Sequence, residues 1–233
     1  MGRVKPGVLM AVLWVLLLFL GSRVLFCLVI VAGVIIALFE FFFMVAQTLG
    51  SGSRILAVAI SLLPVVAACG GSAEAVLISV YLALLGLVVL VLSLFARFED
   101  GWAFLSSAGF AVFYISLCSA FLVLIRFLPD GTSWLLLLTA ITAGPDIGAY
   151  YTGRSFGRRK LCPDISPGKT VNGAVGGILS ATFVALLLSV FLLPENSTFK
   201  ITLAAAVLAG IGIYGDLTES IIKRACGVKD AGT

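Results

Sequence analysis

Charged and hydroxyl side chains gather at the end of the chain, in YGDLTESIIKRACGVKDAGT (214–233), directly after a long apolar run. Four of them are spaced at 0, 3, 4 and 7 and would share one face of a helix: Asp216, Glu219, Ser220 and Lys223. Arg224 follows at once, Gly227 is expected to end the helix, and beyond it lie Lys229 and Asp230. Carboxylates can hold Mg²⁺, and lysine and arginine can hold phosphate. The segment therefore predicts a site for a phosphorylated substrate, or else a solvated helix end held by internal ion pairs.

A second candidate is Asp146 in GPDIGAYYTG (144–153), a stretch that lies inside an apolar span. A carboxylate in a membrane helix is costly unless it faces a polar cavity or a partner, so it is a functional candidate by default. Pro145, just before it, would loosen the helix. We expect Asp146 to serve the site, the alternative being a structural ion pair with Arg154.

The longest polar segment contains a cluster of cations: Arg154, Arg158, Arg159, Lys160 and Lys169. Such a cluster beside a cytosolic membrane face indicates contact with anionic headgroups, or it reflects topology alone. Within it, ISPGKT places Ser166, Lys169 and Thr170 around Gly168. A glycine-containing turn of this kind can hold phosphate through backbone N–H groups. It is not a P-loop, because the first glycine of that motif is absent.

Membrane helices must position these residues. The 233 residues are 61% hydrophobic and 11% charged, with a mean hydropathy of +1.22, far more apolar than a soluble domain. The apolar runs are long enough to cross a bilayer as helices and do not alternate as barrel strands would. We expect an all-α polytopic membrane protein with eight spans: 4–20, 22–46, 54–71, 74–95, 104–127, 133–153, 172–194 and 199–224.

Positive charge is distributed unevenly between the two sides of these spans. With the N-terminus inside, twelve of the fifteen Lys and Arg residues fall on the inner side. The positive-inside rule then places the N-terminus, the 154–171 loop and the C-terminus in the cytosol. We expect a single transmembrane domain over residues 1–233, with N-terminal helices in 1–130 and the helices and loop of the site in 131–233.

The residue types also limit the metal chemistry. The sequence has no histidine, so a metal would need oxygen ligands, which favours magnesium or calcium over zinc. The five cysteines are scattered without a C-x-x-C pair, and we interpret them as unpaired small apolar residues.

Two motifs together resemble one enzyme family. SIIKRACGVKDAGT, preceded by GDLTE, is similar to the first part of the signature of the phosphatidate cytidylyltransferases, also called CDP-diacylglycerol synthases. DIGAYYTGRSFGRRKLCPDISPGKT resembles a second conserved region of that family, and FEFFFM around Glu40 resembles the end of its second span. The resemblance covers nearly the whole chain, most specifically 146–177 and 215–232. The chain departs from the family at Pro145 and at Val171-Asn172, where Trp-Glu is common.

The resemblance implies transfer of a cytidylyl group from CTP to phosphatidic acid, giving CDP-diacylglycerol and pyrophosphate in phospholipid biosynthesis. It implies Mg²⁺ as cofactor, with Asp216 and Glu219 as metal ligands. The implied catalytic residues are Asp216, Lys223 and Asp146. The implied substrate-binding residues are Ser166, Lys169, Thr170, Ser220, Arg224, Lys229 and Asp230.

The expected partners are phosphatidic acid, CTP and the lipid bilayer, with a second copy of the chain as a candidate homodimer partner and no nucleic acid. The expected location is the bacterial inner membrane. The family's His-Gly-Gly and Asp-Arg-x-Asp segment and its last helix are not found before Thr233. We therefore expect an incomplete site and little activity from residues 1–233 alone.

Two other classes of function remain open. One is a transporter coupled to an anion, with Asp146 and Asp216 at broken helices, although no inverted repeat is found. The other is an inactive membrane fragment that keeps the fold of the enzyme.

Overall fold

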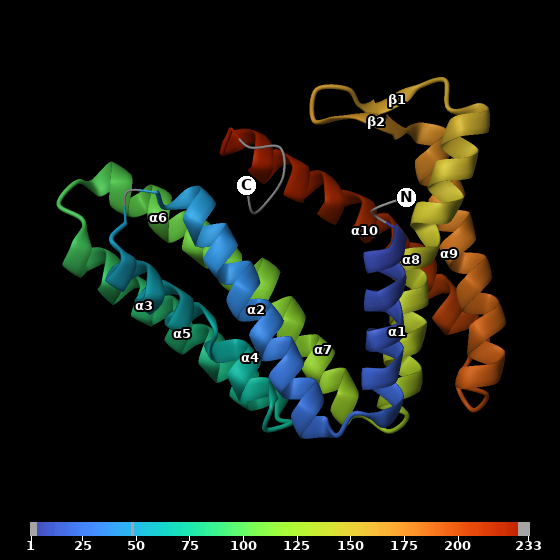
Figure 1. Cartoon of the computed structure of the whole chain (residues 1–233), viewed down its shortest axis with the longest axis horizontal. Coiled ribbons are helices and arrows are strands. Elements are labelled where there is room, and N and C mark those ends of the chain that lie inside the picture. Colours follow the sequence, from blue (N-terminus) through green and yellow to red (C-terminus); the bar gives the residue numbers. More distant parts are fainter. Residues whose placement is uncertain (1–3, 48, 228–233) are drawn as a thin grey trace. The chain divides into compact units, whose positions relative to one another are not determined.

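The computed structural model describes residues 4–47 and 49–227, and every predicted span coincides with one helix or with consecutive helices. The chain forms two compact units that divide at Gly131 (Figure 1). The predicted all-α class is confirmed, with one short hairpin as the exception.

The first unit consists of these helices: α1 (Val4–Leu20), α2 (Arg23–Val45), α3 (Ser51–Ser61), α4 (Leu63–Ala68), α5 (Ala73–Leu94), α6 (Phe98–Ala111), the π-helical turn η1 (Val112–Leu117) and α7 (Cys118–Phe127). Ser22 and Ser72 cap α2 and α5, since each hydroxyl oxygen accepts a backbone N–H from the first turn at 3.1 Å. The third span is interrupted between α3 and α4, where Pro64 lacks an N–H to continue the helix. Fully buried apolar side chains fill the interior: Phe26, Leu38, Phe42, Val65 and Leu87.

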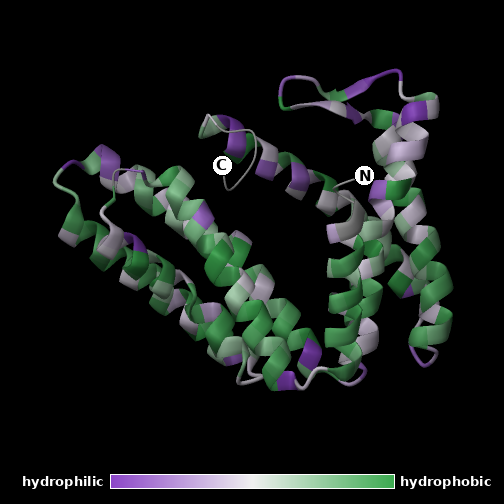
Figure 2. Ribbon diagram, viewed as in Figure 1, coloured by the Kyte–Doolittle hydropathy of each residue, from purple (hydrophilic) through white to green (hydrophobic). Residues whose placement is uncertain are grey.

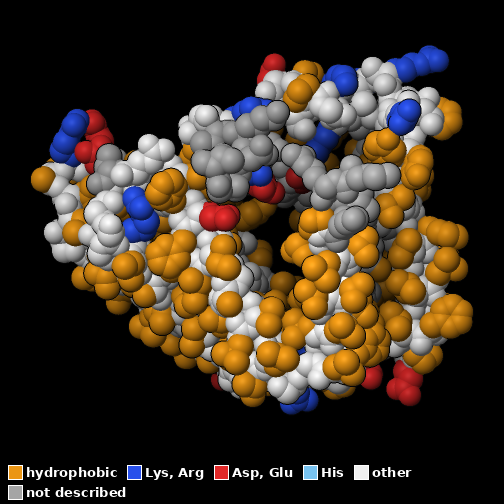
Figure 3. Space-filling view, in the orientation of Figure 1, with side chains coloured by type: hydrophobic (Ala, Val, Ile, Leu, Met, Phe, Trp, Pro, Cys, Tyr) orange, Lys and Arg blue, Asp and Glu red, His pale blue; other side chains and the backbone are white. Residues whose placement is uncertain are grey.

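Most helices are suited to lipid. Among the described residues, six runs are long and apolar enough to cross a membrane: Arg23–Val45, Ser51–Ala68, Ala73–Leu94, Phe98–Phe127, Val171–Leu192 and Thr198–Ala225. Helix α1, with 17 residues, is shorter, and the 26-residue α8 (Gly131–Phe156) is not among the six. Only 22–33% of each run is buried; the helices consist mostly of hydrophobic residues (Figure 2), and hydrophobic side chains cover their flanks (Figure 3). The protein is therefore an integral membrane protein.

The second unit contains the predicted site residues that the structure describes. Its elements are α8, the strands β1 (Lys160–Cys162) and β2 (Ser166–Thr170), α9 (Val171–Leu192) and α10 (Thr198–Ala225). One apolar cluster joins the three helices: Leu137, Ile141, Ala181, Ala185, Leu193, Ile201, Ala205 and Ala209. Because half of this cluster is alanine, the helices can approach closely.

Helices α8 and α9 meet almost backbone to backbone. A Cβ atom on Gly148 would lie 2.6 Å from the carbonyl oxygen of Gly176, and one on Gly176 would overlap the Thr152 side chain. The Ser180 hydroxyl donates to the Gly144 carbonyl across the same contact at 3.1 Å. Small residues are the usual means by which membrane helices pack, because lipid gives no hydrophobic drive for association.

The polar segment between α8 and α9 forms an antiparallel hairpin, which the sequence analysis treated only as a loop. Lys160 lies opposite Thr170 and Cys162 opposite Ser166, with an irregular register between the two pairs. The Val171 N–H donates to the Arg159 carbonyl at 3.0 Å, so the hairpin also joins the end of α8 to the start of α9.

Candidate active site

Thr170 fixes the start of α9 and the position of its neighbour Lys169. Its hydroxyl oxygen accepts the Gly173 N–H at 3.1 Å, and the residue is only 8% exposed. The end of α8 leaves room for it, because a Cβ atom on Gly157 would lie 2.8 Å from this same oxygen. The structure thus gives Thr170 a capping role, and the predicted contact with substrate remains a prediction.

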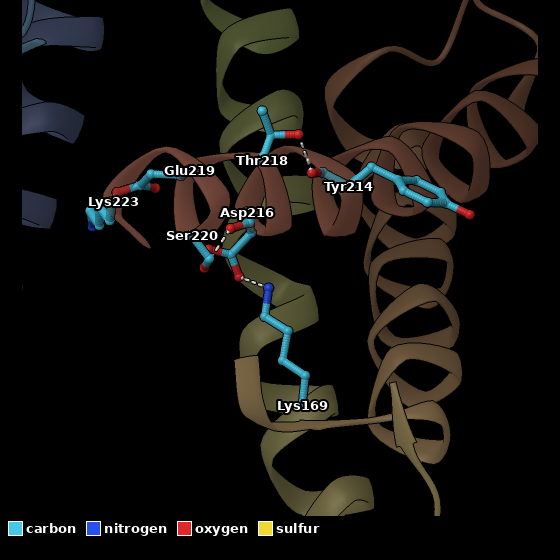
Figure 4. Close-up of polar contacts among 7 residues, drawn as sticks. All are labelled: Lys169, Tyr214, Asp216, Thr218, Glu219, Ser220 and Lys223. Carbon is cyan, nitrogen blue, oxygen red and sulfur yellow. Dashed lines mark hydrogen bonds and ion pairs between the residues drawn. The ribbon is translucent and has the colours of Figure 1, made fainter. Parts of the chain in front are cut away.

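Lys169 of β2 forms an ion pair with Asp216 of α10, Nζ to Oδ2 (Figure 4). The Lys169 nitrogen is buried, whereas the Asp216 side chain remains 59% exposed. The sequence analysis placed both residues in the site but assigned one to substrate and the other to metal. The structure brings the two residues into direct contact, so the Lys169 ammonium group already lies against the Asp216 carboxylate, the proposed metal ligand.

A second ion pair lies one turn further along α10. Lys223 Nζ is 2.6 Å from Glu219 Oε1, and the Glu219 side chain is 54% exposed. The Ser220 hydroxyl donates to the backbone carbonyl of Asp216 at 2.9 Å, which is a bond within the helix. In Figure 4 the Asp216 carboxylate points to Lys169 and the Glu219 carboxylate to Lys223. The predicted helix through these residues is confirmed, but their two carboxylates do not converge on one point.

The structure also describes two of the remaining predicted substrate-binding residues. Arg224 is exposed in the last turn of α10, and Ser166 is half-buried at the start of β2. Gly227 has a φ of +71° and follows the last helical turn, so its predicted role in ending the helix is confirmed. Lys229 and Asp230 lie outside the described residues.

Asp146 is exposed on α8. Among the residues that the structure describes, no hydrogen bond or salt bridge to its side chain is present, and Arg154 instead donates to the Tyr150 hydroxyl at 2.8 Å. The alternative interpretation, an Asp146–Arg154 ion pair within α8, is therefore not what the structure shows. A carboxylate in this position needs a polar surrounding or a ligand, and its functional role stays a prediction.

Asn172 is a residue whose role the sequence analysis missed. Its side-chain amide donates to the backbone carbonyl of Phe156, the last residue of α8. A helix C-terminus leaves carbonyls without intrahelical donors, so Asn172 satisfies one of them. The only signal for it in the sequence was the departure from the Trp-Glu of the resembled family.

The donors of this site fit magnesium only with help from substrate. Among the described residues no group of three or more Asp, Glu, Cys or His side chains could hold a metal ion. Asp216 and Glu219 offer carboxylate oxygens that are more than half exposed. Magnesium commonly binds one or two carboxylates together with substrate phosphates, and this donor set is of that kind.

The fold and the site define a polytopic helical membrane protein with lysine–carboxylate pairs at one helix end. The profile described as "Cytidylyltransferase family" matches residues 1–233. The chain belongs to the cytidylyltransferase family.

Individual relatives agree with this assignment. The phosphatidate cytidylyltransferase of Bacillus subtilis (strain 168) is 33% identical over 238 residues, covering 99% of this chain and 86% of the relative. The phosphatidate cytidylyltransferase of Haemophilus influenzae is 42% identical over 43% of this chain, and the match spans 36% of that relative. The "Uncharacterized protein YnbB" of Escherichia coli (strain K12) is 41% identical over 44% of this chain and 34% of its own length.

Proposed function

We propose that this protein transfers the cytidylyl group of CTP to phosphatidic acid, forming CDP-diacylglycerol and releasing pyrophosphate. The family match over the whole chain and the similarity to the phosphatidate cytidylyltransferase of Bacillus subtilis support this activity. The structural observation that carries the proposal is the end of α10, where Asp216 pairs with Lys169 and Glu219 pairs with Lys223, with Arg224 in the same last turn. Such a set suits reactants that are phosphates and need a metal for charge neutralisation.

In this reaction a phosphate oxygen of phosphatidic acid attacks the α-phosphorus of CTP. A new P–O bond forms while the bond from the α-phosphorus to the bridging oxygen of the β-phosphate breaks, and its electron pair leaves with pyrophosphate. Both reactants are anions, so the protein must offset their repulsion and hold them in line. Lys223 and Arg224, on adjacent positions of α10, would bind phosphate oxygens, and Lys169 would bind them from the hairpin.

Magnesium is part of the proposal as well. Asp216 would hold it together with the phosphates of CTP, and Glu219 would join as a ligand by turning away from Lys223; the bound ion would neutralise charge on those phosphates. Ser220, one helical turn after Asp216, would bind substrate, and Asp146 would help to keep the site polar. These are the roles that the resemblance implied for the same residues.

The proposed location is a bacterial inner membrane, with the hairpin and the end of α10 facing the cytosol. The charge distribution supports this orientation, because twelve of fifteen Lys and Arg residues fall on that side. CTP would arrive from water, and the acyl chains of phosphatidic acid would stay in the bilayer.

The direct test uses the full-length protein, including any residues that its gene encodes after Thr233, purified in detergent with CTP labelled at the α-phosphate. We expect label to enter the lipid fraction when dioleoyl phosphatidic acid and Mg²⁺ are present, with equimolar pyrophosphate. Dioleoylglycerol, which lacks the attacking phosphate, is the matched control and should remain unlabelled. A protein that folds but leaves phosphatidic acid unlabelled over a full Mg²⁺ titration would refute the proposed activity.

A further inference from the structure

The contact between Lys169 and Asp216 has a consequence for any cation that approaches this acid. Lys169 Nζ touches Asp216 Oδ2, and the ammonium nitrogen has no contact with solvent. A metal ion bound to the same carboxylate would stand within a few ångströms of this ammonium group. Two cations at that separation repel each other, and water screens the repulsion only in part because the Lys169 nitrogen is buried. Lys169 and a metal at Asp216 therefore compete.

The neighbouring pair provides an internal comparison. Lys223 contacts Glu219, four residues before it on the same helix, so this pair lies within α10. Lys169 instead reaches Asp216 from β2, whose position depends on the hairpin and on the Thr170 cap. Loss of the Lys169–Asp216 contact would free both the carboxylate and a cation that the backbone already holds near the site.

The pair is suited to exchange rather than to permanent structure. The Asp216 side chain is 59% exposed, and exposed ion pairs are worth about 0–1 kcal/mol because water screens them. A triphosphate oxygen carries charge comparable to a carboxylate and can accept from the same ammonium group. Binding of a nucleotide–metal complex could thus replace one weak ion pair by two stronger ones.

We propose that Lys169 is a positioning residue that exchanges partners. Without nucleotide its ammonium group occupies the cation position on Asp216 and weakens binding of free metal there. When the nucleotide arrives with its metal, Lys169 moves to a phosphate oxygen and Asp216 takes the metal. This inference rests on the proposed function, since it requires Asp216 to be the metal ligand. The arrangement ties metal binding to nucleotide binding, so that free Mg²⁺ alone does not fill the site.

The test measures binding of Mn²⁺, a paramagnetic substitute for Mg²⁺, to the detergent-purified full-length protein by the electron paramagnetic resonance signal of the free ion. Lys169→Met removes the charge and keeps the length of the side chain. In the absence of nucleotide we expect it to bind Mn²⁺ about tenfold more tightly than the wild type, the effect of removing one nearby like charge at a partly exposed site. Lys169→Arg keeps the charge and should bind Mn²⁺ as the wild type does.

Lys223→Met is the matched control, because it removes a lysine that pairs with the other carboxylate. It should strengthen Mn²⁺ binding by clearly less than Lys169→Met does. Lys169→Met should have the opposite effect on nucleotide binding: the affinity for CTP should fall, which raises the KM for CTP. A role in structure alone would weaken both ligands together, so tighter metal and weaker nucleotide in one variant distinguish the exchange.

Two results overturn the inference while the wild type still makes CDP-diacylglycerol: unchanged or weaker Mn²⁺ binding by Lys169→Met, or equal strengthening by Lys223→Met. Asp216→Asn in the Lys169→Met background should abolish the gain in Mn²⁺ affinity, and a retained gain would also overturn the inference. Failure of the wild type to label phosphatidic acid would instead refute the proposed function, whatever the Mn²⁺ measurements show.

Discussion

Lys169 and Asp216 form an ion pair although one lies on a short strand and the other on the long helix α10. The pair connects the hairpin between α8 and α9 to the helix that carries Glu219, Lys223 and Arg224. The Asp216 carboxylate is exposed, whereas the Lys169 nitrogen is buried. A soluble nucleotide would therefore meet the carboxylate first. This geometry makes Asp216 the first residue to test.

Asp216→Asn in the full-length protein should lower the rate of CDP-diacylglycerol formation about a thousandfold, equivalent to roughly 4 kcal/mol of barrier. The change is nearly isosteric but replaces an anionic ligand by an amide, which magnesium binds poorly. The measurement is turnover of labelled CTP across a Mg²⁺ titration, with size-exclusion profiles to verify folding. Asp164→Asn, in the exposed turn of the hairpin, is the matched control and should turn over normally. Near-normal turnover by Asp216→Asn would remove this residue from the site.

Thr170→Ala should destabilise the start of α9 by about 1 kcal/mol, the usual effect of losing an N-cap hydroxyl. The hydroxyl oxygen accepts the Gly173 N–H, and alanine offers no replacement. Thermal unfolding in detergent measures the effect, with a midpoint lowered by about 2–4 °C for a chain of this size. Thr170→Ser keeps the oxygen and should unfold close to the wild-type temperature. If serine destabilised the protein as much as alanine, the cap would not be the reason.

Gly148→Ala should be strongly destabilising, by about 1–3 kcal/mol, because overpacking at a close helix contact forces the backbones apart. The added Cβ would lie 2.6 Å from the Gly176 carbonyl oxygen, an atom that cannot turn away. Gly210→Ala is the control, since no atom lies within 4 Å of the corresponding Cβ on α10. That variant should unfold at or above the wild-type temperature, because alanine favours the helix. Comparable loss in both variants would contradict the proposed cause.

Cys162 should be inaccessible to a membrane-impermeant maleimide in intact cells and react after permeabilisation. The prediction follows from the cytosolic placement of the hairpin by the positive-inside rule. The experiment uses a variant in which Cys162 is the only cysteine. Asn196→Cys, in the exposed turn between α9 and α10, should react in intact cells because that turn is predicted to lie outside. Labelling of Cys162 before permeabilisation would reverse the topology.

The parts of the fold that the sequence predicted are those that depend on local pattern. The length of the continuous apolar runs predicted the spans. Gly227 predicted the end of α10, because glycine has no Cβ and adopts the left-handed conformation found there without strain. Helical spacing placed Glu219 and Lys223 together, and the structure pairs them. Local pattern could not reveal that Lys169 crosses from the hairpin to Asp216, because that contact depends on how α9 and α10 pack.

The same limit explains the other differences. The strand pairing between Lys160 and Thr170 involves a short polar stretch without alternating hydrophobicity, so no periodic signal predicted it. The Asn172 side chain donates to the Phe156 carbonyl at the end of α8. An asparagine amide can bond to any backbone carbonyl, so the sequence alone does not identify which one it meets. The Asp146–Arg154 pair is absent because Arg154 bonds to Tyr150, a nearer partner four residues before it on the same helix, which the sequence analysis did not consider.

The glycine contact between α8 and α9 has a mechanical consequence. Where two helices touch through long side chains, rotamer changes can absorb small displacements, but the Gly148–Gly176 contact consists of backbone and the short side chains of Thr152 and Ser180. The two helices should consequently move as one rigid body, together with the hairpin that connects them. Any adjustment to substrates of different size would then have to come from bending of α10 or from the lysine side chains, and hydrogen–deuterium exchange would be slowest along the α8–α9 seam.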